Sequence, residues 1–270
     1  MCVGKKVVHV QRVSYSSLSL FGECPERFRR TRMSGLHMED HGSNESARGE
    51  IVHRLMEDIM NFKMANGVWP NPEWVEKRSD VLWTTGFSTH GHNVLDSVTD
   101  AKLREKSMED TKLLIPQMYT DIFPMVDPLA VEREIELELP YPGREITQLV
   151  GKVDLISAPN FIIDWKTRKS PINERWVDSD LQATVYTALT GMKKAVVMFV
   201  QFIFLKTKDP RIEIVTTSRD ERHTRWLLED HIPQVIQSIE NDIFPPTPGW
   251  WCGNCPVKCG LFPEYEVEVP

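Results

Sequence analysis

Two apolar segments joined by a short turn constrain the fold of this chain most. Residues 148–157 (QLVGKVDLIS) and 160–169 (NFIIDWKTRK) have the composition of strands, and proline and asparagine in the intervening SAPN favour a turn. We predict a β-hairpin with a three-residue loop, residues 158–160. In that register Ser157 pairs with Phe161, so the hairpin fixes which side chains of the two strands face each other.

The predicted register brings two carboxylates together on one face of the sheet. Asp154 lies opposite Asp164, and directly opposed residues have Cβ atoms about 5 Å apart. Like charges at this distance destabilise a sheet unless a cation lies between them, and a divalent cation is the obvious candidate. Lys166 shares the face of Asp164 because side chains alternate along a strand. The alternative is a cross-strand ion pair between Asp154 and Lys166, but the apolar neighbours predict a partly buried site.

The remaining patterns predict one mixed α/β domain, with helices before, between and after a sheet. Apolar residues recur at helical spacing after an exposed loop at 34–49, and beyond residue 130 the period changes to two. Between residues 70 and 128 we expect helices and loops broken by Pro116 and Pro124. The expected helices are 46–64, capped by Ser43 or Ser46, 179–191, ending at Gly191, and 219–242, kinked near Pro233; the further strands are 131–140, 195–206 in the centre and 211–217 at an edge.

The composition is that of an ordinary globular protein in a reducing compartment. Of 270 residues, 41% are hydrophobic and 26% are charged, and we expect an intracellular, cytoplasmic protein because no apolar run suggests a membrane span or signal peptide. A formal net charge of −7 argues against coating nucleic acid by electrostatics alone. It leaves room for an enzyme with local basic residues. The segment ERFRRTR, residues 26–32, is either a solvated basic turn or a phosphate contact.

Two pairs of residues four apart belong to predicted helices. Gly49 and His53 lie on one helical face, and we expect the glycine to leave space beside the imidazole. Gln182 and Tyr186 also share a face, where both polar groups can reach a phosphate or position a neighbouring side chain. Each pair alone is ordinary helix chemistry.

Four short motifs in order resemble those of the RecB-like branch of the PD-(D/E)XK nucleases. They are GEIVH (49–53), GKVD (151–154), DWK (164–166) and QATVY (182–186), and the resemblance covers roughly residues 14–260. It implies an α/β fold with a restriction-endonuclease-like core, in which helices flank a central mixed sheet. It also implies a single nuclease domain over residues 1–270, with a helical insertion at about 65–128.

The resemblance assigns roles to residues of these motifs. By position, His53, Asp154 and Asp164 would bind Mg²⁺ or Mn²⁺ together with the Trp165 main-chain carbonyl, and Glu132 or Glu134 is a weaker candidate. Lys166 would be the catalytic lysine. The expected catalytic set is Lys166, Asp164, Asp154, Gln182 and Tyr186, and the expected DNA contacts are Arg27, Arg29, Arg30 and Tyr186.

Four cysteines are similar to those of the iron–sulfur members of this branch, which include the AddB nuclease domain, the CRISPR-adaptation nucleases and the exonuclease V type. Cys24 occurs in a Cys-Pro-x-x-Phe setting, and Cys252, Cys255 and Cys259 follow the core. The resemblance implies a [4Fe–4S] cluster that joins the N- and C-terminal segments as a clasp. The final Cys-x₃-Cys spacing is shorter than the family's Cys-x₅-Cys, so structural Zn²⁺ is the alternative. Cys2 is left over as a free thiol.

The function implied is that of a stand-alone, metal-dependent DNA exonuclease acting on single-stranded ends, with metal-activated water as the nucleophile. The alternatives are an endonuclease in recombination or spacer processing, and a non-catalytic DNA-binding subunit. The sequence has no Gly-x₄-Gly-Lys-Ser/Thr loop, so we expect any helicase or recombination protein that works with it to be a separate partner. Small stand-alone members of this type resemble those carried by phages. We expect no membrane partner.

Overall fold

The structure is a computed structural model that describes residues 12–33, 43–89, 92–98, 100–144, 146–205, 208–255, 257 and 259. The described residues form two compact units. The first contains those of 1–40, 136–151 and 222–270, and the second those of 41–135 and 152–221. Two of the boundaries between the units fall within strands, one in β4 (Pro128–Glu138) and one in β5 (Gln148–Ser157).

Hydrogen bonds join the long strands into a mixed sheet in the order β1-β5-β6-β7-β8, with β4 also paired to β5. The β1–β5 and β6–β7 pairs are parallel, and the β5–β6 and β7–β8 pairs are antiparallel. Ser157 pairs with Phe161, which confirms the predicted hairpin register. The apolar β7 is central and β8 is at an edge, as predicted. The strands not yet delimited are β1 (Arg12–Ser14), β6 (Phe161–Arg168), β7 (Lys194–Ile203) and β8 (Arg211–Asp220).

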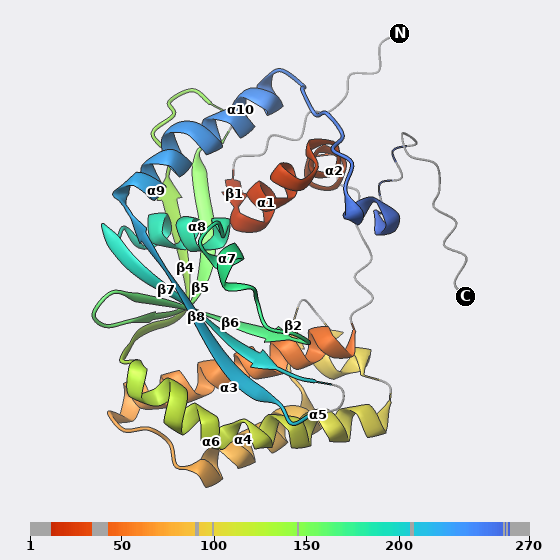
Figure 1. Cartoon of the computed structure of the whole chain (residues 1–270), viewed down its shortest axis with the longest axis vertical. Helices are drawn as coiled ribbons and strands as arrows, with labels where there is room; N and C mark the ends of the chain where they lie inside the picture. The colour runs from red at the N-terminus through yellow and green to blue at the C-terminus, as the bar shows by residue number, and fades with distance from the viewer. Residues whose placement is uncertain are drawn as a thin grey trace. The chain divides into compact units, whose positions relative to one another are not determined.

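Helices cover both faces of the strands in the second unit (Figure 1). Helix α3 packs on β6, and α4, α5 and α6 lie on that side of the sheet around α3, whereas α7 and α8 pack on β7 and β8 from the other side. A short hairpin of β2 (Ser88–Thr89) and β3 (His92–Asn93) lies in the region where only helices and loops were expected. The helices are α3 (Asn44–Asn66), α4 (Pro72–Thr85), α5 (Ala101–Leu113), α6 (Ile115–Gln117), α7 (Glu174–Val177) and α8 (Leu181–Thr190), with 3₁₀ turns at Val94–Ser97 and Phe123–Met125 and a π-helical turn at Met118–Ile122.

The first unit carries the helices near both ends of the described chain. The predicted C-terminal helix is a helical run that changes type, from α9 through a π-helical turn to α10, and residues 219–220 belong to β8 instead. Pro233 lies in the first turn of α10, where its missing N–H is tolerated. Its helices are α1 (Tyr15–Glu23), α2 (Pro25–Phe28), α9 (Glu221–Trp226) and α10 (Ile232–Glu240), with π-helical turns at Arg29–Met33 and Leu227–His231 and a 3₁₀ turn at Trp250–Asn254. No helix among the described residues is long and apolar enough to cross a membrane.

The start of α3 differs from the sequence prediction. Ser43, one of the two predicted caps, is the N-cap, and its hydroxyl accepts from the Ser46 amide. The helix therefore begins at Asn44, two residues before the predicted start, and residues 44–49 of the predicted loop are helical. Residues 34–42 of that loop lie outside the described residues. The helix ends at Gly67, whose φ of 73° is the left-handed conformation that favours glycine.

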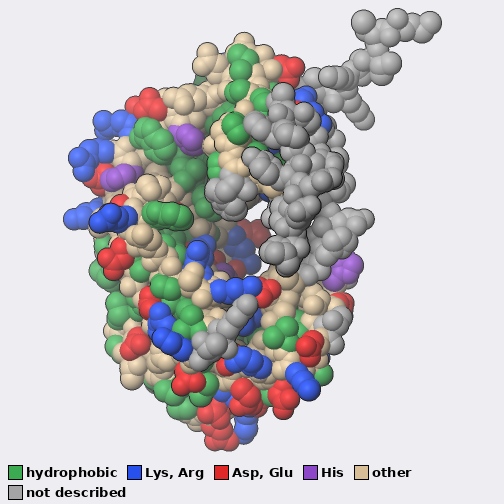
Figure 2. Space-filling model, turned by 45° about the vertical axis from the view of Figure 1, so that its right-hand side comes forward, with side chains coloured by type: hydrophobic (Ala, Val, Ile, Leu, Met, Phe, Trp, Pro, Cys, Tyr) green, Lys and Arg blue, Asp and Glu red, His purple; other side chains and the backbone are tan. Residues whose placement is uncertain are grey.

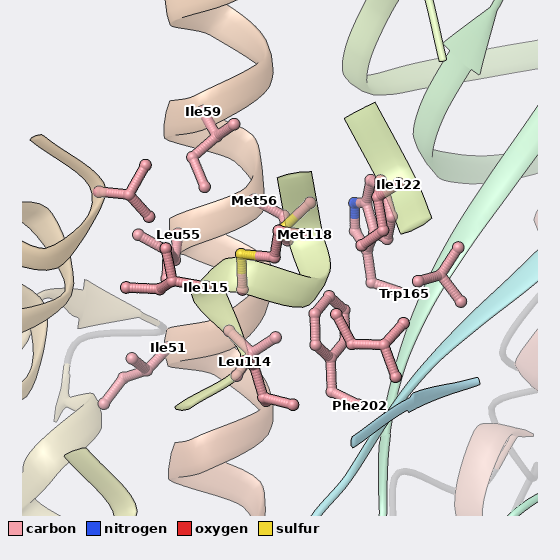
Figure 3. Packing of buried hydrophobic residues seen from close by; sticks show 14 of the residues in the cluster. Ile51, Leu55, Met56, Ile59, Leu114, Ile115, Met118, Ile122, Trp165 and Phe202 are labelled. Carbon is pink, nitrogen blue, oxygen red and sulfur yellow. The ribbon is translucent and has the colours of Figure 1, made fainter. Parts of the chain in front are cut away.

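The core of the second unit lies between α3 and the sheet. Ile51, Leu55 and Ile59 of α3 are fully buried, and Figure 3 shows them beside side chains of the 114–122 region. Trp165 and Phe202 contribute the sheet side of this cluster. Full burial of each such side chain stabilises the fold by about 1.5–3 kcal/mol. The core thereby fixes α3 on the strand that carries Asp164.

Charged side chains on the surface are mixed in sign. On the face shown in Figure 2, Lys and Arg are interspersed with Asp and Glu rather than gathered into one basic surface. This mixture of signs fits a formal net charge of only −7, and it means that any binding of nucleic acid would depend on local basic groups.

Gly49 has a different purpose from the one predicted. A Cβ built on it would lie 2.9 Å from Thr167 Oγ1, and no atom of the His53 side chain lies within 4 Å of that position. The glycine therefore lets α3 approach β6 closely; the expectation that it leaves space beside the imidazole was wrong. The physical reason is that the atom nearest to a Cβ at position 49 belongs to the threonine of the neighbouring strand and not to the imidazole one turn along the helix.

We predict that Gly49→Ala destabilises the protein by about 1–3 kcal/mol, although alanine is the better helix former by about 1 kcal/mol. Thr167→Ala removes the clashing oxygen, so the double variant should recover most of this loss. Denaturant unfolding of the four proteins in the cycle measures the coupling. Additive effects of the two substitutions would show that the close approach is not what requires glycine.

Candidate active site

Three potential metal ligands from three elements of the second unit meet at the sheet. One ligand atom each of His53 (α3), Glu132 (β4) and Asp154 (β5) lies within 4.8 Å of the others, the one such group found among the described residues. Imidazole nitrogen and carboxylate oxygens suit Mg²⁺ and especially Mn²⁺. The donor set therefore fits the metal that the motifs implied.

Glu132 reaches this group because its backbone departs from regular strand geometry. Its φ is 47°, which is uncommon for a residue with a side chain, and Val131 and Glu132 are both partly buried where a regular strand would alternate. Its Oε2 lies 2.6 Å from Lys152 Nζ. Glu134 is exposed. Of the two glutamates that sequence reasoning left open, the structure brings Glu132 to the site.

Asp154 is held by the strand that it faces. Its Oδ2 accepts a hydrogen bond from the Trp165 amide at 2.9 Å and lies 3.6 Å from His53 Nδ1. Burial lowers the pKa of His53 and the main chain of Trp165 opposes this, so the imidazole also lies beside Trp165. That the Trp165 carbonyl binds the metal stays a prediction.

Asp164 and Lys166 lie on the opposite face of β6 from Trp165 and meet α8. Lys166 Nζ lies 2.7 Å from Asp164 Oδ2 and donates to Gln182 Oε1 at 2.9 Å. Gln182 Nε2 donates to Asp164 Oδ1 and to the Tyr186 hydroxyl, both at 2.8 Å. All four residues predicted from the DWK and QATVY motifs are thus in one network.

Burial controls the charge of the site. Desolvation raises the pKa of Asp154 to about 7 and that of Asp164 to about 7, and each of these carboxyls is nearly inaccessible to solvent. For Asp164, Lys166 opposes this rise and Asp154 adds to it. Desolvation lowers the pKa of His53, which keeps the imidazole neutral and able to bind a metal.

Sequence reasoning missed Arg219, which anchors the start of α8. Its guanidinium donates to the main-chain oxygens of Val177, Asp178 and Asp180, and its Nε donates to Thr184 Oγ1 at 2.9 Å. Arg219 is only 2% exposed, so these bonds are not exchanged for water. The anchor fixes the helix that presents Gln182. A lone arginine near the end of an edge strand gives no such signal in sequence.

The predicted cysteines lie in the first unit. Cys24 is buried, and its sulfur accepts a long hydrogen bond from the Thr247 amide at 3.5 Å, while the Gly249 amide donates to Cys252 Sγ at 3.4 Å. The segment before the last three cysteines therefore touches the first one. None of the described cysteines, Cys24, Cys252, Cys255 and Cys259, forms a disulfide.

The predicted DNA-contacting arginines are engaged with carboxylates of their own segment. Arg29 Nε and Arg30 Nε lie 2.7 and 2.6 Å from the carboxylate of Glu26. Arg27 pairs with Glu23 at 3.4 Å. A phosphate would have to compete with these pairs, and the DNA contact remains a prediction.

We predict that Mn²⁺ stabilises the protein more at pH 8 than at pH 5.5. The folded-state pKa values of Asp154 and Asp164, about 7, exceed the unfolded value of about 3.9, so the metal-free fold binds more protons and loses stability as pH rises from about 4 to about 7. A cation replaces those protons. Thermal unfolding with and without Mn²⁺ tests this. An equal Mn²⁺ shift at both pH values, or the same pH dependence in Asp154→Asn/Asp164→Asn, would contradict it.

Solved structures and a family model are similar to this chain. The crystal structure of the "Putative exonuclease" from Eubacterium rectale has a TM-score of 0.51 and 14% identity, covering 94% of this chain and 92% of that one. The crystal structure of SSO0001 follows with a TM-score of 0.40 and 12% identity, covering 91% and 83%. No curated protein matches by sequence. The family model of the PD-(D/E)XK nuclease superfamily matches residues 12–259, and the chain therefore belongs to this superfamily.

Proposed function

We propose that this nuclease is a Mg²⁺- or Mn²⁺-dependent DNA exonuclease that acts on single-stranded ends. The observation that carries the proposal is that Trp165, between Asp164 and Lys166, donates its amide to Asp154. This bond joins the His53, Glu132 and Asp154 group to the strand of the Asp164, Lys166 and Gln182 network, although Asp164 itself is not part of the ligand group. The exonuclease assignment is supported by the name of the similar protein from Eubacterium rectale. The alternatives, which the experiments below distinguish from an exonuclease, are an endonuclease and a non-catalytic DNA-binding subunit.

In this proposal His53, Asp154 and Asp164 hold the cation together with the Trp165 carbonyl, and Glu132 completes the set. A bound cation would supply the Lewis acid that neutralises charge on the phosphate and makes a bound water acidic. The protein contributes a preformed, largely dry arrangement of ligands. Burial of both aspartates favours an occupied site, because ionised carboxylates are otherwise costly there.

Lys166 acts directly on the substrate in this proposal. Contacts to Asp164 and Gln182 fix its ammonium, yet 29% of its side chain is accessible, so that it can meet a phosphodiester. A fixed cation beside the reacting phosphate stabilises the charge that develops in the transition state and orients the attacking water.

Gln182 and Tyr186 hold this arrangement. The side-chain amide of Gln182 accepts from Lys166 through its oxygen and donates to Asp164 through its nitrogen. Because one partner is a donor and the other an acceptor, the orientation of the amide is fixed. Tyr186 keeps its proton, because burial and the nearby carboxylates raise its pKa. We assign its hydroxyl to the DNA backbone, which a neutral phenol can contact as a donor.

We also propose that Cys24, Cys252, Cys255 and Cys259 hold a [4Fe–4S] cluster in the first unit. The support is the contact between the Thr247 amide and Cys24 Sγ and the Gly249 amide bond to Cys252 Sγ. Hydrogen bonds to sulfur tune such clusters. Structural Zn²⁺ is the competing occupant.

The proposed partner is DNA, with a separate helicase or recombination protein supplying any duplex opening. Because basic and acidic side chains are interspersed on the face seen in Figure 2, binding would depend on local groups. Arg27, Arg29 and Arg30 are proposed contacts that exchange their carboxylate partners for phosphate.

We predict that Lys166→Met and Asp164→Asn each lower Mg²⁺- or Mn²⁺-dependent cleavage of linear single-stranded DNA by at least about 100-fold, because each removes a group that acts on the transition state. Lys77→Met is the matched control, since Lys77 is exposed on α4 and pairs only with Glu73 among the described contacts. End-labelled oligonucleotides measure the rates.

Covalently closed circular single strands separate the alternatives. The proposal expects linear DNA to be degraded and circles to survive. Cleavage of circles would identify an endonuclease, and binding without cleavage of either substrate would identify a non-catalytic subunit. Full activity in Lys166→Met would refute the assigned site.

We predict that anaerobically purified protein absorbs broadly near about 400 nm, as iron–sulfur charge transfer does. Cys24→Ser should lose most of this band and the bound iron, while Cys2→Ser, outside the proposed set, should retain both. Stoichiometric zinc without the band would assign the site to zinc.

A further inference from the structure

A groove opens beside the metal-ligand group, on the side of β4 and β5. Its volume is about 520 Å³, within the range of about 300–1,000 Å³ typical of small-molecule sites. His53 and Glu132 belong both to its wall and to the ligand group, so a molecule in the groove touches the reaction centre. The lining residues are Ser46, Gly49, Glu50, His53, Arg54, Glu57, Phe87, Ser88, Glu132 and Lys152.

One wall is a single face of α3. Its lining residues extend from Ser46 to Glu57, which are eleven residue steps apart, or about 16 Å along the helix axis. His53 lies within this face, with Glu50 about one turn before it and Glu57 about one turn after it. The helix thus presents a metal ligand flanked on both sides by carboxylates.

The charges of the groove do not favour a phosphate. Both of its cations are paired with its carboxylates: Arg54 Nη1 lies 3.2 Å from Glu57 Oε2, and Lys152 Nζ lies 2.6 Å from Glu132 Oε2. Glu50 adds a third carboxylate to the lining. These carboxylates would therefore repel a phosphate beyond the reaction centre, whereas they would not repel an uncharged nucleoside.

The groove also offers what a nucleoside needs. Phe87 is partly buried against the core, and the guanidinium carbon of Arg54 lies 5.9 Å from its ring centroid. An aromatic ring and a planar guanidinium are the two groups on which bases stack. Ser46, Ser88 and the carboxylates can bond to sugar hydroxyls and base amino groups.

We infer that this groove binds the terminal nucleoside of a DNA strand, its base against Phe87 and Arg54 and its first phosphodiester at the metal-ligand group. The inference deepens the proposed function and rests on it. A strand that continued through the groove would carry its next phosphate towards Glu50 or Glu57. The groove therefore selects an end with a free hydroxyl, which is how the site would act as an exonuclease.

Terminal-base stacking can be measured without turnover. The Lys166→Met protein in Mg²⁺ is mixed with a 12-nucleotide oligothymidylate that carries 2-aminopurine at the 5′ end, the 3′ end or the centre. We expect fluorescence of one terminal probe to be quenched on binding. Phe87→Leu, which keeps the apolar packing, should abolish that quenching and weaken binding about tenfold, and Phe87→Tyr should retain both. The central probe should respond alike in all three proteins.

The role of the carboxylates has its own measurement. With the wild-type protein, a phosphate on the attacked end should slow removal of the first nucleotide at least about tenfold relative to a hydroxyl. Glu50→Gln/Glu57→Gln should narrow this difference, and the control Glu73→Gln on α4 should not. The inference would be overturned if ends with a phosphate and ends with a hydroxyl were degraded at equal rates, whether the enzyme attacks the 5′ or the 3′ end.

The outcomes distinguish this inference from the proposed function. Wild-type protein without metal-dependent cleavage would refute the function itself. Normal degradation of linear DNA, with circles left intact and no terminal probe sensitive to Phe87, would refute only the terminal-nucleoside site.

Discussion

The desolvation of two carboxylates on neighbouring strands is the constraint on which the rest of the site depends. Asp154 and Asp164 are buried together, and burial raises the pKa of each to about 7. A fold that buries two acids needs cations to keep them ionised. Lys166 supplies one positive charge from the same strand as Asp164, and a divalent cation on the side of His53 would supply the rest.

The surrounding structure maintains this arrangement through close approach and local strain. Gly49 brings α3 against Thr167, which places His53 over the sheet. Arg219 fixes the main chain before α8 and thereby presents Gln182 to the acids. Glu132 adopts a left-handed backbone that a regular strand would not tolerate, and strain of this kind gathers at functional sites. Function thus depends on positions that touch no substrate.

The hairpin and the sites within it were predictable because they depend on local chemistry. Alternation and the SAPN turn set the register, and the register alone placed Asp154 near Asp164. Departures from regularity were not predictable. Nothing in the sequence of this strand distinguishes Glu132 from Glu134. The irregular backbone at Glu132, which interrupts the alternation of side chains, brings Glu132 and not Glu134 to the site. The purpose of Gly49 also depends on a partner more than one hundred residues away.

The central claim is that the buried acids exist to hold a divalent cation. Anomalous diffraction at the manganese edge from crystals grown with Mn²⁺ tests it most directly. We expect a peak bounded by His53, Glu132, Asp154, Asp164 and the Trp165 carbonyl. A saturated crystal with no peak there, and the acids instead protonated and bonded to each other, would contradict it.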